Sequence, residues 1–348
     1  MHFKIKKSII CKDIDINQYQ IDKEMTFSYI PTVGDVAVFE VISIGKHKQI
    51  QTDNKLNTLI LPGDFIMGAF GTRYATSQFE GYLPADCRDT FHILGAGGTI
   101  GVIHSTHSTF SGGPTVLKIV GYLKDKRDNV VNTKKIKPRL MPFRGINYRD
   151  ANIILSIGSS MDSGKTTTAA YLTRGLKLNE NRVAFIKLTG TVYTKDRDLV
   201  YDCGADITAD FSDYGFPSTY MCDEQELLDL FQTLLNKVSI IEPNYIVIEI
   251  ADGILQRETK MLLENQRFTS MIDQVIFSSC DSLSALYGLE SLKKMGIYPT
   301  AISGLLTASP LLIKEVKENS FIPVFTIEQL MYEKTVQLFS KPQMKFAL

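Results

Sequence analysis

The sequence predicts an α/β protein whose C-terminal domain has a mostly parallel sheet flanked by helices, preceded by a smaller N-terminal β-barrel or sandwich-like domain. Two observations predict this. After residue 150, apolar runs alternate with helix-length segments, a pattern typical of parallel strands joined by helices. Before residue 125, short β-rich runs are separated by turn residues, which favours a barrel or sandwich. A chain of 348 residues is long enough for two such domains.

We expect four regions along the chain. They are a β-rich domain (1–125), a linker (126–150), an α/β domain (151–330) and a C-terminal extension (331–348). The linker is expected because Lys134–Arg139 is basic and contains Pro138, and because the preceding residues are polar.

The strands expected in the N-terminal domain cover residues 36–42, 58–61, 65–70 and 115–122. Turn signals such as Pro62-Gly63-Asp64 and the glycines of 95–98 separate them. No long amphipathic helix is predicted in this domain.

Strands and helices alternate in the C-terminal domain. The expected strands are 153–157, 183–186, 245–250, 275–277, 301–306 and 324–325, and the expected helices are 166–178, 224–238, 282–295 and 311–318. Asp223 and Glu226 have the spacing of a capping box at the start of the second helix. Ligands of such a sheet bind at the carboxyl ends of its strands.

Composition excludes several classes of protein. Lys and Arg total 38, as do Asp and Glu, so the excess of positive charge that general nucleic-acid or membrane-surface binders use is missing. No apolar run reaches the ~20 residues that span a bilayer, and the first residues do not resemble a signal peptide. The five cysteines form no CxxC pair. We therefore expect a cytoplasmic protein with neither a membrane nor a nucleic acid as partner.

A phosphate-binding loop is predicted at residues 158–166. The stretch has the glycine-to-Gly-Lys-Thr pattern, with one residue more between the glycines than the usual spacing, and it lies between an apolar strand and a predicted helix. Backbone N–H groups and a helix N-terminus would hold the phosphates of ATP, or of GTP, with Mg²⁺ on the threonine hydroxyl. The expected nucleotide-binding residues are Gly158, Ser159, Ser160, Met161, Ser163, Gly164, Lys165, Thr166 and Thr167.

Acidic and basic residues near other strand ends predict the catalytic side of the site. Glu249 ends an apolar strand, and Lys187 is the lysine of a Lys-x-x-Gly sequence that follows another strand. Asp198 is the metal candidate among several aspartates that follow Lys187, so Thr166, Asp198 and Glu249 are the predicted metal ligands. Asp162 lies inside the loop, where a carboxylate would repel phosphate unless it faced a metal, a substrate amine or a partner subunit. The predicted catalytic residues are Lys165, Asp162, Lys187 and Glu249.

Residues 152–330 resemble the dethiobiotin-synthetase-like branch of the SIMIBI class of P-loop proteins. That branch also holds the molybdopterin-guanine dinucleotide biosynthesis adaptor and a family related to D-glutamate N-acetyltransferase. The resemblance rests on 158–166, 187–190, 249–253 and the strand and helix of 274–296 ahead of 301–306. Ser159-Ser160 stands where such synthetases have a Thr-Asp pair, and 249–253 differs from their Glu-Gly-Ala-Gly-Gly.

The resemblance implies a role for each matching residue. Lys165 would bind phosphate, Thr166 and Glu249 would serve the Mg²⁺ site, and Lys187 would contact substrate or phosphate. Asp198 resembles an aspartate that the adaptor and synthetase place after their second strand. The class often forms homodimers across the nucleotide, which would let Asp162 act on the neighbouring subunit.

Two functions are compatible with these features. The first is an ATP-dependent, ligase- or synthetase-like enzyme that activates a small carboxylate or amine metabolite by phosphoryl transfer. The second is a nucleotide-hydrolysing adaptor or switch that acts on a partner protein or cofactor.

Overall fold

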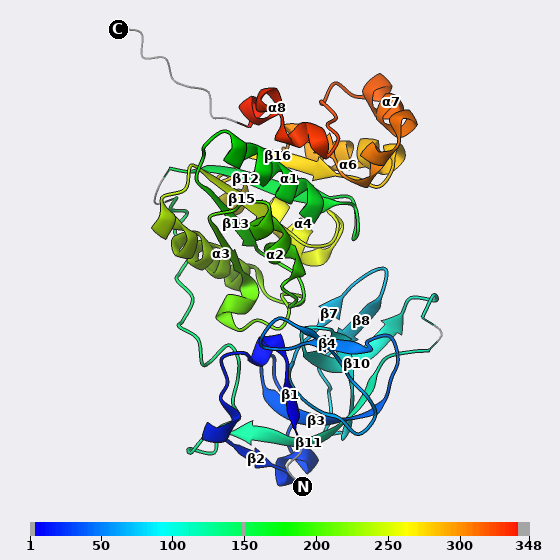
Figure 1. The fold of residues 1–348 in the computed structure, drawn as a ribbon, viewed down its shortest axis with the longest axis vertical. Coiled ribbons are helices and arrows are strands. Elements are labelled where there is room, and N and C mark those ends of the chain that lie inside the picture. Colours follow the sequence, from blue (N-terminus) through cyan, green and yellow to red (C-terminus); the bar gives the residue numbers. More distant parts are fainter. Residues whose placement is uncertain (1–3, 111, 148–149, 340–348) are drawn as a thin grey trace. The chain divides into compact units, whose positions relative to one another are not determined.

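The computed structural model describes residues 4–110, 112–147 and 150–339, and the chain forms two compact units (Figure 1). The first unit comprises Met1–Leu140 and two later segments, Gly190–Thr194 and Phe211–Met221. The second comprises Met141–Thr189, Lys195–Asp210 and Cys222–Leu348. The predicted linker 126–150 is thus divided between the units at residue 140, and the predicted domain 151–330 lacks the two segments that belong to the first unit.

The regular structure described in the first unit consists of strands and short 3-10 helices. The strands are β1 (Ile5–Lys7), β2 (Gln20–Asp22), β3 (Val36–Ser43), β4 (Gln49–Gln51), β5 (Asn57–Leu59), β6 (Phe65–Phe70), β7 (Arg73–Tyr74), β8 (Phe79–Tyr82), β9 (Thr90–Gly95), β10 (Thr99–Thr106) and β11 (Val116–Lys124). The expected strands 36–42 and 65–70 are β3 and β6, whereas 58–61 stops at Leu59 and 115–122 extends to Lys124.

Strand pairing in the first unit returns to its starting point. β6 pairs with β3, β3 with β11, β11 with β9 and β9 with β10, all antiparallel, and β10 then pairs with β6 in parallel. A closed circuit leaves none of these five strands with an unpaired edge.

Aromatic side chains fill the space between these strands. Phe70 lies 5.0 Å from Phe91 and 5.5 Å from Phe39, measured between ring centroids, in edge-to-face contacts. Tyr122 stacks on Phe70 at 5.8 Å. All four rings are buried, so they supply much of the apolar area that stabilises the unit.

The segments 190–194 and 211–221 are hydrogen-bonded into the first unit. Gln51 on β4 exchanges two hydrogen bonds with Thr194, of 2.8 and 3.0 Å. The hydroxyl of Thr99 on β10 donates to the carbonyl of Pro217 at 2.9 Å, and that of Thr72 donates to the carbonyl of Tyr220 at 2.6 Å. These bonds satisfy backbone and side-chain groups that would otherwise be buried without partners.

The second unit contains a parallel sheet in the order β14-β13-β15-β12-β16-β17, flanked by helices, as predicted. Its strands are β12 (Asn152–Gly158), β13 (Val183–Lys187), β14 (Ile207–Asp210), β15 (Tyr245–Glu249), β16 (Gln274–Ser278) and β17 (Ala301–Ser303). Its helices are α1 (Lys165–Leu178), α2 (Lys195–Asp202), α3 (Glu224–Val238), α4 (Arg257–Glu264), α5 (Gln266–Thr269), α6 (Ser282–Lys294), α7 (Pro310–Asn319) and α8 (Glu333–Leu338).

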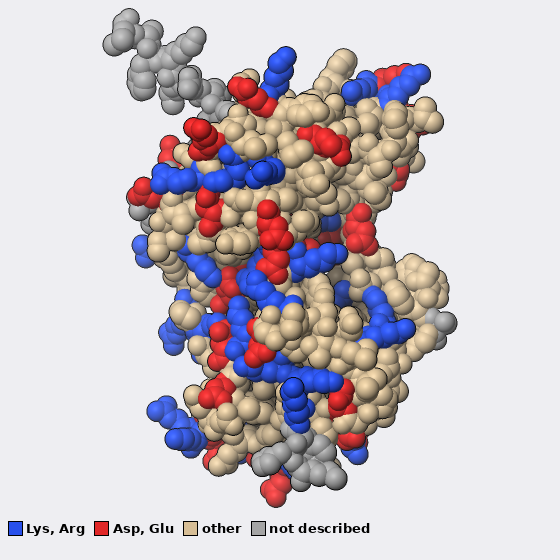
Figure 2. All heavy atoms as spheres, in the orientation of Figure 1, with Lys and Arg blue, Asp and Glu red and all other residues tan. Residues whose placement is uncertain are grey.

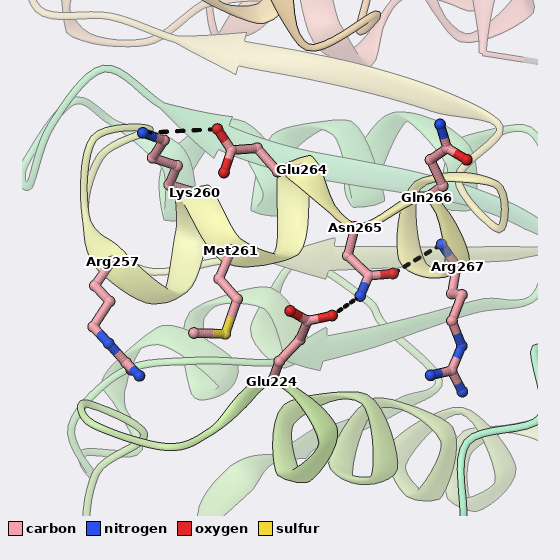
Figure 3. Close-up of a pocket in the computed structure, with 8 residues that line it drawn as sticks. All are labelled: Glu224, Arg257, Lys260, Met261, Glu264, Asn265, Gln266 and Arg267. Atoms are coloured by element: carbon pink, nitrogen blue, oxygen red, sulfur yellow. Dashed lines mark hydrogen bonds and ion pairs between the residues drawn. The ribbon is translucent and has the colours of Figure 1, made fainter.

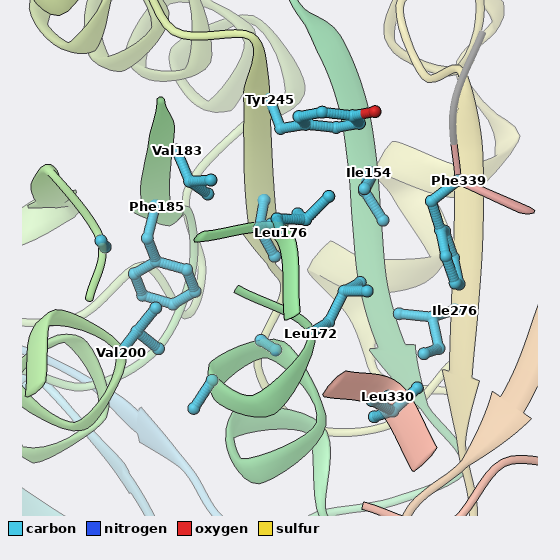
Figure 4. Close-up of a cluster of buried hydrophobic side chains, with 14 of the residues drawn as sticks. Ile154, Leu172, Leu176, Val183, Phe185, Val200, Tyr245, Ile276, Leu330 and Phe339 are labelled. Carbon is cyan, nitrogen blue, oxygen red and sulfur yellow. The ribbon is translucent and has the colours of Figure 1, made fainter. Parts of the chain in front are cut away.

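One face of this sheet packs against α1. Leu172 and Leu176 of α1 lie in one cluster with Ile154 of β12 (Figure 4). Val247 of β15 belongs to the same cluster, and all four side chains are fully buried. Val200 of α2 joins the same cluster. Because side chains alternate along a strand, every second residue of these strands faces α1, which sets the direction of the residues at their ends.

Several elements differ from the sequence expectations. Helices α2, α4 and α5 and strand β14 were not predicted, because they are short. Residues 324–325 form no strand; Val324 makes only an isolated bridge to Ile302. The side chain of Asp223 accepts a hydrogen bond from the N–H of Glu226 at 2.7 Å, so the predicted start of α3 is confirmed.

The predicted C-terminal extension belongs in part to the second unit. Val336 on α8 and the following Phe339 are buried against the α1 face of the sheet. The remainder of the expected extension, 340–348, lies outside the described residues.

Charged residues of both signs are interspersed over the face shown in Figure 2, in keeping with the balanced composition. Among the helices that the structure describes, none combines the length and the apolar character needed to cross a bilayer.

A buried histidine of the first unit has cations as neighbours. The imidazole of His47 is buried, and burial, reinforced by the charges of Arg73 and Lys46, lowers the pKa of His47 to about 3. The ammonium of Lys46 lies over the rings of Phe79 and Phe110, at 5.1 and 4.4 Å from their centroids. His47 is therefore neutral in the folded protein at neutral pH.

This burial predicts acid sensitivity. Below the unfolded-state pKa of about 6.5 the unfolded chain binds a proton that the folded chain does not, so the free energy of unfolding should fall by about 2 kcal/mol between pH 7 and pH 5. Urea unfolding at both pH values measures this. His47→Gln should flatten the pH dependence, whereas His104→Gln, at an exposed position, should not; equal slopes in all three proteins would contradict the prediction.

Candidate functional site

The predicted phosphate loop has the expected strand–loop–helix geometry. The fully buried strand β12 ends at Gly158, and α1 begins at Lys165. Between them Asp162 and Gly164 have positive φ angles of 61° and 94°, so the backbone turns tightly. The loop therefore lies at the carboxyl end of a central strand, where ligands of such sheets bind.

Neighbouring loops hold the phosphate loop closely on two sides. The N–H of Ile254 donates to the carbonyl of Gly158, and that of Leu305 to the carbonyl of Ser163, both at 3.0 Å. A Cβ atom on Gly253 would lie 2.4 Å from the carbonyl oxygen of Ser159, and one on Gly304 would lie 2.4 Å from that of Ser163. Both positions therefore require glycine.

Lys165 is buried within the loop that it follows. Its ammonium donates to the carbonyl of Ser160 at 2.7 Å, and its side chain is nearly inaccessible to solvent. Burial lowers the pKa of Lys165, although the charge of Glu249 opposes the shift. An anion bound in the loop would compensate this buried charge.

The remaining loop residues are less enclosed. Ser160 contacts the thiol of Cys280 at 3.4 Å. The hydroxyl oxygen of Ser159 is buried and has no hydrogen-bond partner among the described residues. Met161, Thr166 and Thr167 are partly exposed. This hydroxyl is therefore able to bond to a ligand held in the loop.

The structure brings three predicted residues together at the ends of neighbouring strands. Lys187 and Glu249 are register partners on β13 and β15, so their side chains lie on one face of the sheet, the face covered by α1. The carboxylate oxygen Oε1 of Glu249 accepts hydrogen bonds from Thr166 at 2.9 Å and from Lys187 at 2.5 Å. Its other oxygen, Oε2, is buried and has no hydrogen-bond partner among the described residues.

Asp196 also belongs to this cluster, although it was not among the predicted site residues. Its carboxylate lies 2.8 Å from the ammonium of Lys187. Asp196 and the predicted metal ligand Asp198 both lie in the first turn of α2. The buried Val200, four residues after Asp196, is the signal that could have located this helix and its inward face.

Opposite charges control the ionisation of this cluster. Burial disfavours the charged ammonium of Lys187, but Asp196 and Glu249 outweigh that effect and raise its pKa. Burial raises the pKa of Glu249, and Lys187 opposes that shift. Burial also tends to raise the pKa of Asp196, but the charge of Lys187 outweighs burial, so the pKa of Asp196 is lowered. Lys187 is thus a permanent cation between two carboxylates.

The donor set suits Mg²⁺ bound mainly through a nucleotide. Within the described ranges no three His, Cys, Asp or Glu side chains converge as a self-contained metal site. Thr166 instead offers a hydroxyl oxygen, and Glu249 offers the carboxylate oxygen Oε2, which has no hydrogen-bond partner among the described residues. Both are hard oxygen ligands, which Mg²⁺ prefers alongside phosphates and water.

A separate groove of the second unit contains none of the predicted site residues. It has a volume of about 570 Å³ and lies between α4, α5 and the start of α3 (Figure 3). Its polar side chains pair with one another: Lys260 lies 3.7 Å from Glu264, and Asn265 bonds to Glu224. This groove offers no group in need of a ligand.

Comparison with protein-family models finds no match, and neither does comparison with curated proteins. Solved structures do match. The signal recognition particle receptor FtsY from Elizabethkingia anophelis aligns at 16% identity with a TM-score of 0.36, over 55% of this chain and 65% of the receptor chain. Its complex with GDP aligns at 16% identity and a TM-score of 0.37, over 62% and 76% of the two chains.

FtsY from Mycoplasma mycoides also aligns, at 13% identity and a TM-score of 0.37, over 58% of this chain and 68% of that chain. The aligned region is just under two thirds of the first receptor's length. At this level of similarity the function of FtsY does not transfer to this chain.

The close packing around the loop gives a test. Gly253→Ala would push the backbone of Ser159 away and should weaken nucleotide binding by about tenfold or more, since even a 1 Å displacement of a binding group is costly. Isothermal titration calorimetry with Mg²⁺ and nucleotide measures it. Gly112→Ala, where a Cβ meets open space, is the control. Equal affinities would show that the loop is not held as described.

Proposed function

We propose that the second unit binds a nucleoside triphosphate with Mg²⁺ at residues 158–166 and transfers its terminal phosphoryl group. One observation carries the proposal. Oε1 of Glu249 accepts a hydrogen bond from the Thr166 hydroxyl beside the phosphate loop, while its buried Oε2 has no hydrogen-bond partner among the described residues. Strand-end carboxylates and a loop hydroxyl serve Mg²⁺ in this way in P-loop NTPases.

Each residue has a role in this proposal. The loop N–H groups and the N-terminus of α1 bind the phosphates, and Lys165 exchanges the Ser160 carbonyl for a phosphate oxygen. Bound Mg²⁺ would neutralise charge on the outer phosphates. Glu249 orients the Thr166 hydroxyl, and its free oxygen would hold a ligand of that ion. Lys187 supplies a fixed positive charge near the terminal phosphate.

We further propose that this activity belongs to an ATP-dependent enzyme of the SIMIBI class that activates a small carboxylate or amine. The buried ammonium of Lys187 supports the proposal, since such a cation suits both a phosphoryl group and a substrate carboxylate. The phosphoryl group would pass to a carboxylate oxygen, leaving nucleoside diphosphate and a mixed anhydride. The closed circuit of the first unit would be a small barrel in the same chain.

A nucleotide-dependent switch is the second candidate, and Asp162 favours it. This carboxylate is exposed within the phosphate loop, on a residue with a φ angle of 61°. An exposed acid in that place suits contact with a second copy of the chain or another partner. Hydrolysis that rises steeply with protein concentration would favour the switch, whereas hydrolysis stimulated by a metabolite at fixed protein concentration would favour the enzyme.

Lys165→Ala provides the primary test. It removes the cation that contacts the phosphates, so phosphate release from ATP or GTP should fall by about 100-fold or more while the unfolding temperature changes little. Release of inorganic phosphate and thermal unfolding are the two measurements. Arg174→Ala, at an exposed position of the same helix, is the control. Turnover retained in Lys165→Ala would refute the proposal.

A further inference from the structure

Lys187 contacts two carboxylates that differ in their access to water. Glu249 lies at 2.5 Å and its side chain is 1% exposed, whereas Asp196 lies at 2.8 Å and its side chain is 40% exposed. Glu249 ends a central strand, and Asp196 lies on the first turn of a separate helix, α2. The two contacts therefore have different energetic consequences when they are broken.

The contact with Glu249 is the harder one to lose. Separating Lys187 from Glu249 would leave a fully buried carboxylate without its counter-charge, which is strongly unfavourable. Asp196, in contrast, can take up water when it releases Lys187, because its own side chain is 40% exposed. Asp196 is the exchangeable partner of this lysine.

Lys165 shows the same arrangement on the other side of the site. Its ammonium binds the Ser160 carbonyl of the loop itself, an acceptor that a phosphate oxygen would replace. Both lysines near the loop thus hold an acceptor from the protein in a position suited to an anion.

We propose that Asp196 is a place-holding anion, which occupies the position on Lys187 that an oxyanion of the bound ligand takes. This inference rests on the proposed nucleotide site. The oxyanion is either the terminal phosphate of the nucleotide or an anionic group of a second substrate. In both cases Asp196 competes with the ligand for Lys187. Where the oxyanion is the terminal phosphate, the intact protein therefore discriminates less between triphosphate and diphosphate than Lys187 alone would allow.

Asp196→Asn tests the inference. Calorimetry with Mg²⁺ gives dissociation constants for adenine and guanine diphosphates and for their non-hydrolysable β,γ-imido triphosphates. The preference for triphosphate over diphosphate should rise by about fivefold in Asp196→Asn, a typical size for coupling between neighbouring groups. Asp202→Asn, the same change at the exposed end of α2, should leave this ratio unchanged.

A second set of titrations separates the two sources of oxyanion. Inorganic phosphate or acetate is added to the diphosphate complex of each protein. A gain in Asp196→Asn with triphosphate alone identifies the terminal phosphate as the displacing group. A gain with added acetate identifies a carboxylate of a second substrate, whereas a gain with added phosphate, which can occupy the position of the terminal phosphate, supports the first source. Either result supports the inference.

A ratio that is unchanged or lowered in Asp196→Asn, with no gain from added anions, would overturn it. Asp196→Ser replaces Asp196→Asn if the asparagine variant unfolds at a lower temperature than Asp202→Asn. Failure of the intact protein to bind any nucleotide would instead overturn the proposed function, and the inference with it, so the two failures are distinguishable.

Discussion

The second unit depends on Glu249, a carboxylate so deeply buried that its charge needs a counter-charge. Glu249 lies at the end of a central strand with almost no access to water, and Lys187 compensates it from the adjacent strand. Parallel register makes this possible, because it aligns the ends of β13, β15 and β12 on the face that α1 covers. Thr166, at the start of α1, then reaches the same oxygen. The ion pair and the phosphate loop are thus one construction, and neither can shift without the other.

Local patterns were sufficient to predict much of this arrangement. The glycine and lysine pattern of 158–166 located the loop, and alternation of long apolar strands with helices predicted the parallel sheet. Lys187 and Glu249 could be identified because each follows an apolar strand, and alternation along β13 and β15 puts both on one face. Asp196 was missed because α2 is short and mostly polar, so its periodicity is weak. The pairing order of the first unit joins distant segments and has no local signature.

The two candidate functions share the same nucleotide chemistry and differ in the second molecule that binds at the site. An enzyme needs a second anionic or amine substrate beside Lys187, whereas a switch needs a surface that changes with the nucleotide. The buried cluster of Glu249, Lys187 and Asp196 supports the enzyme, and the exposed Asp162 supports the switch. Because the groups are separate, nucleotide chemistry and partner recognition could change independently through mutation.

The segments 190–194 and 211–221 bear on how this chain can be divided. The backbone passes from one unit to the other five times, at residues 140, 189, 194, 210 and 221. A fragment starting at residue 141 would carry both segments without the strands that accept them, leaving Thr194 and the carbonyl of Pro217 without their partners. The β-rich unit cannot be removed as an appended module by a cut in the linker. The β-rich unit is complete only when it takes in two segments that lie beyond residue 141, so expression of residues 1–140 alone would omit part of it.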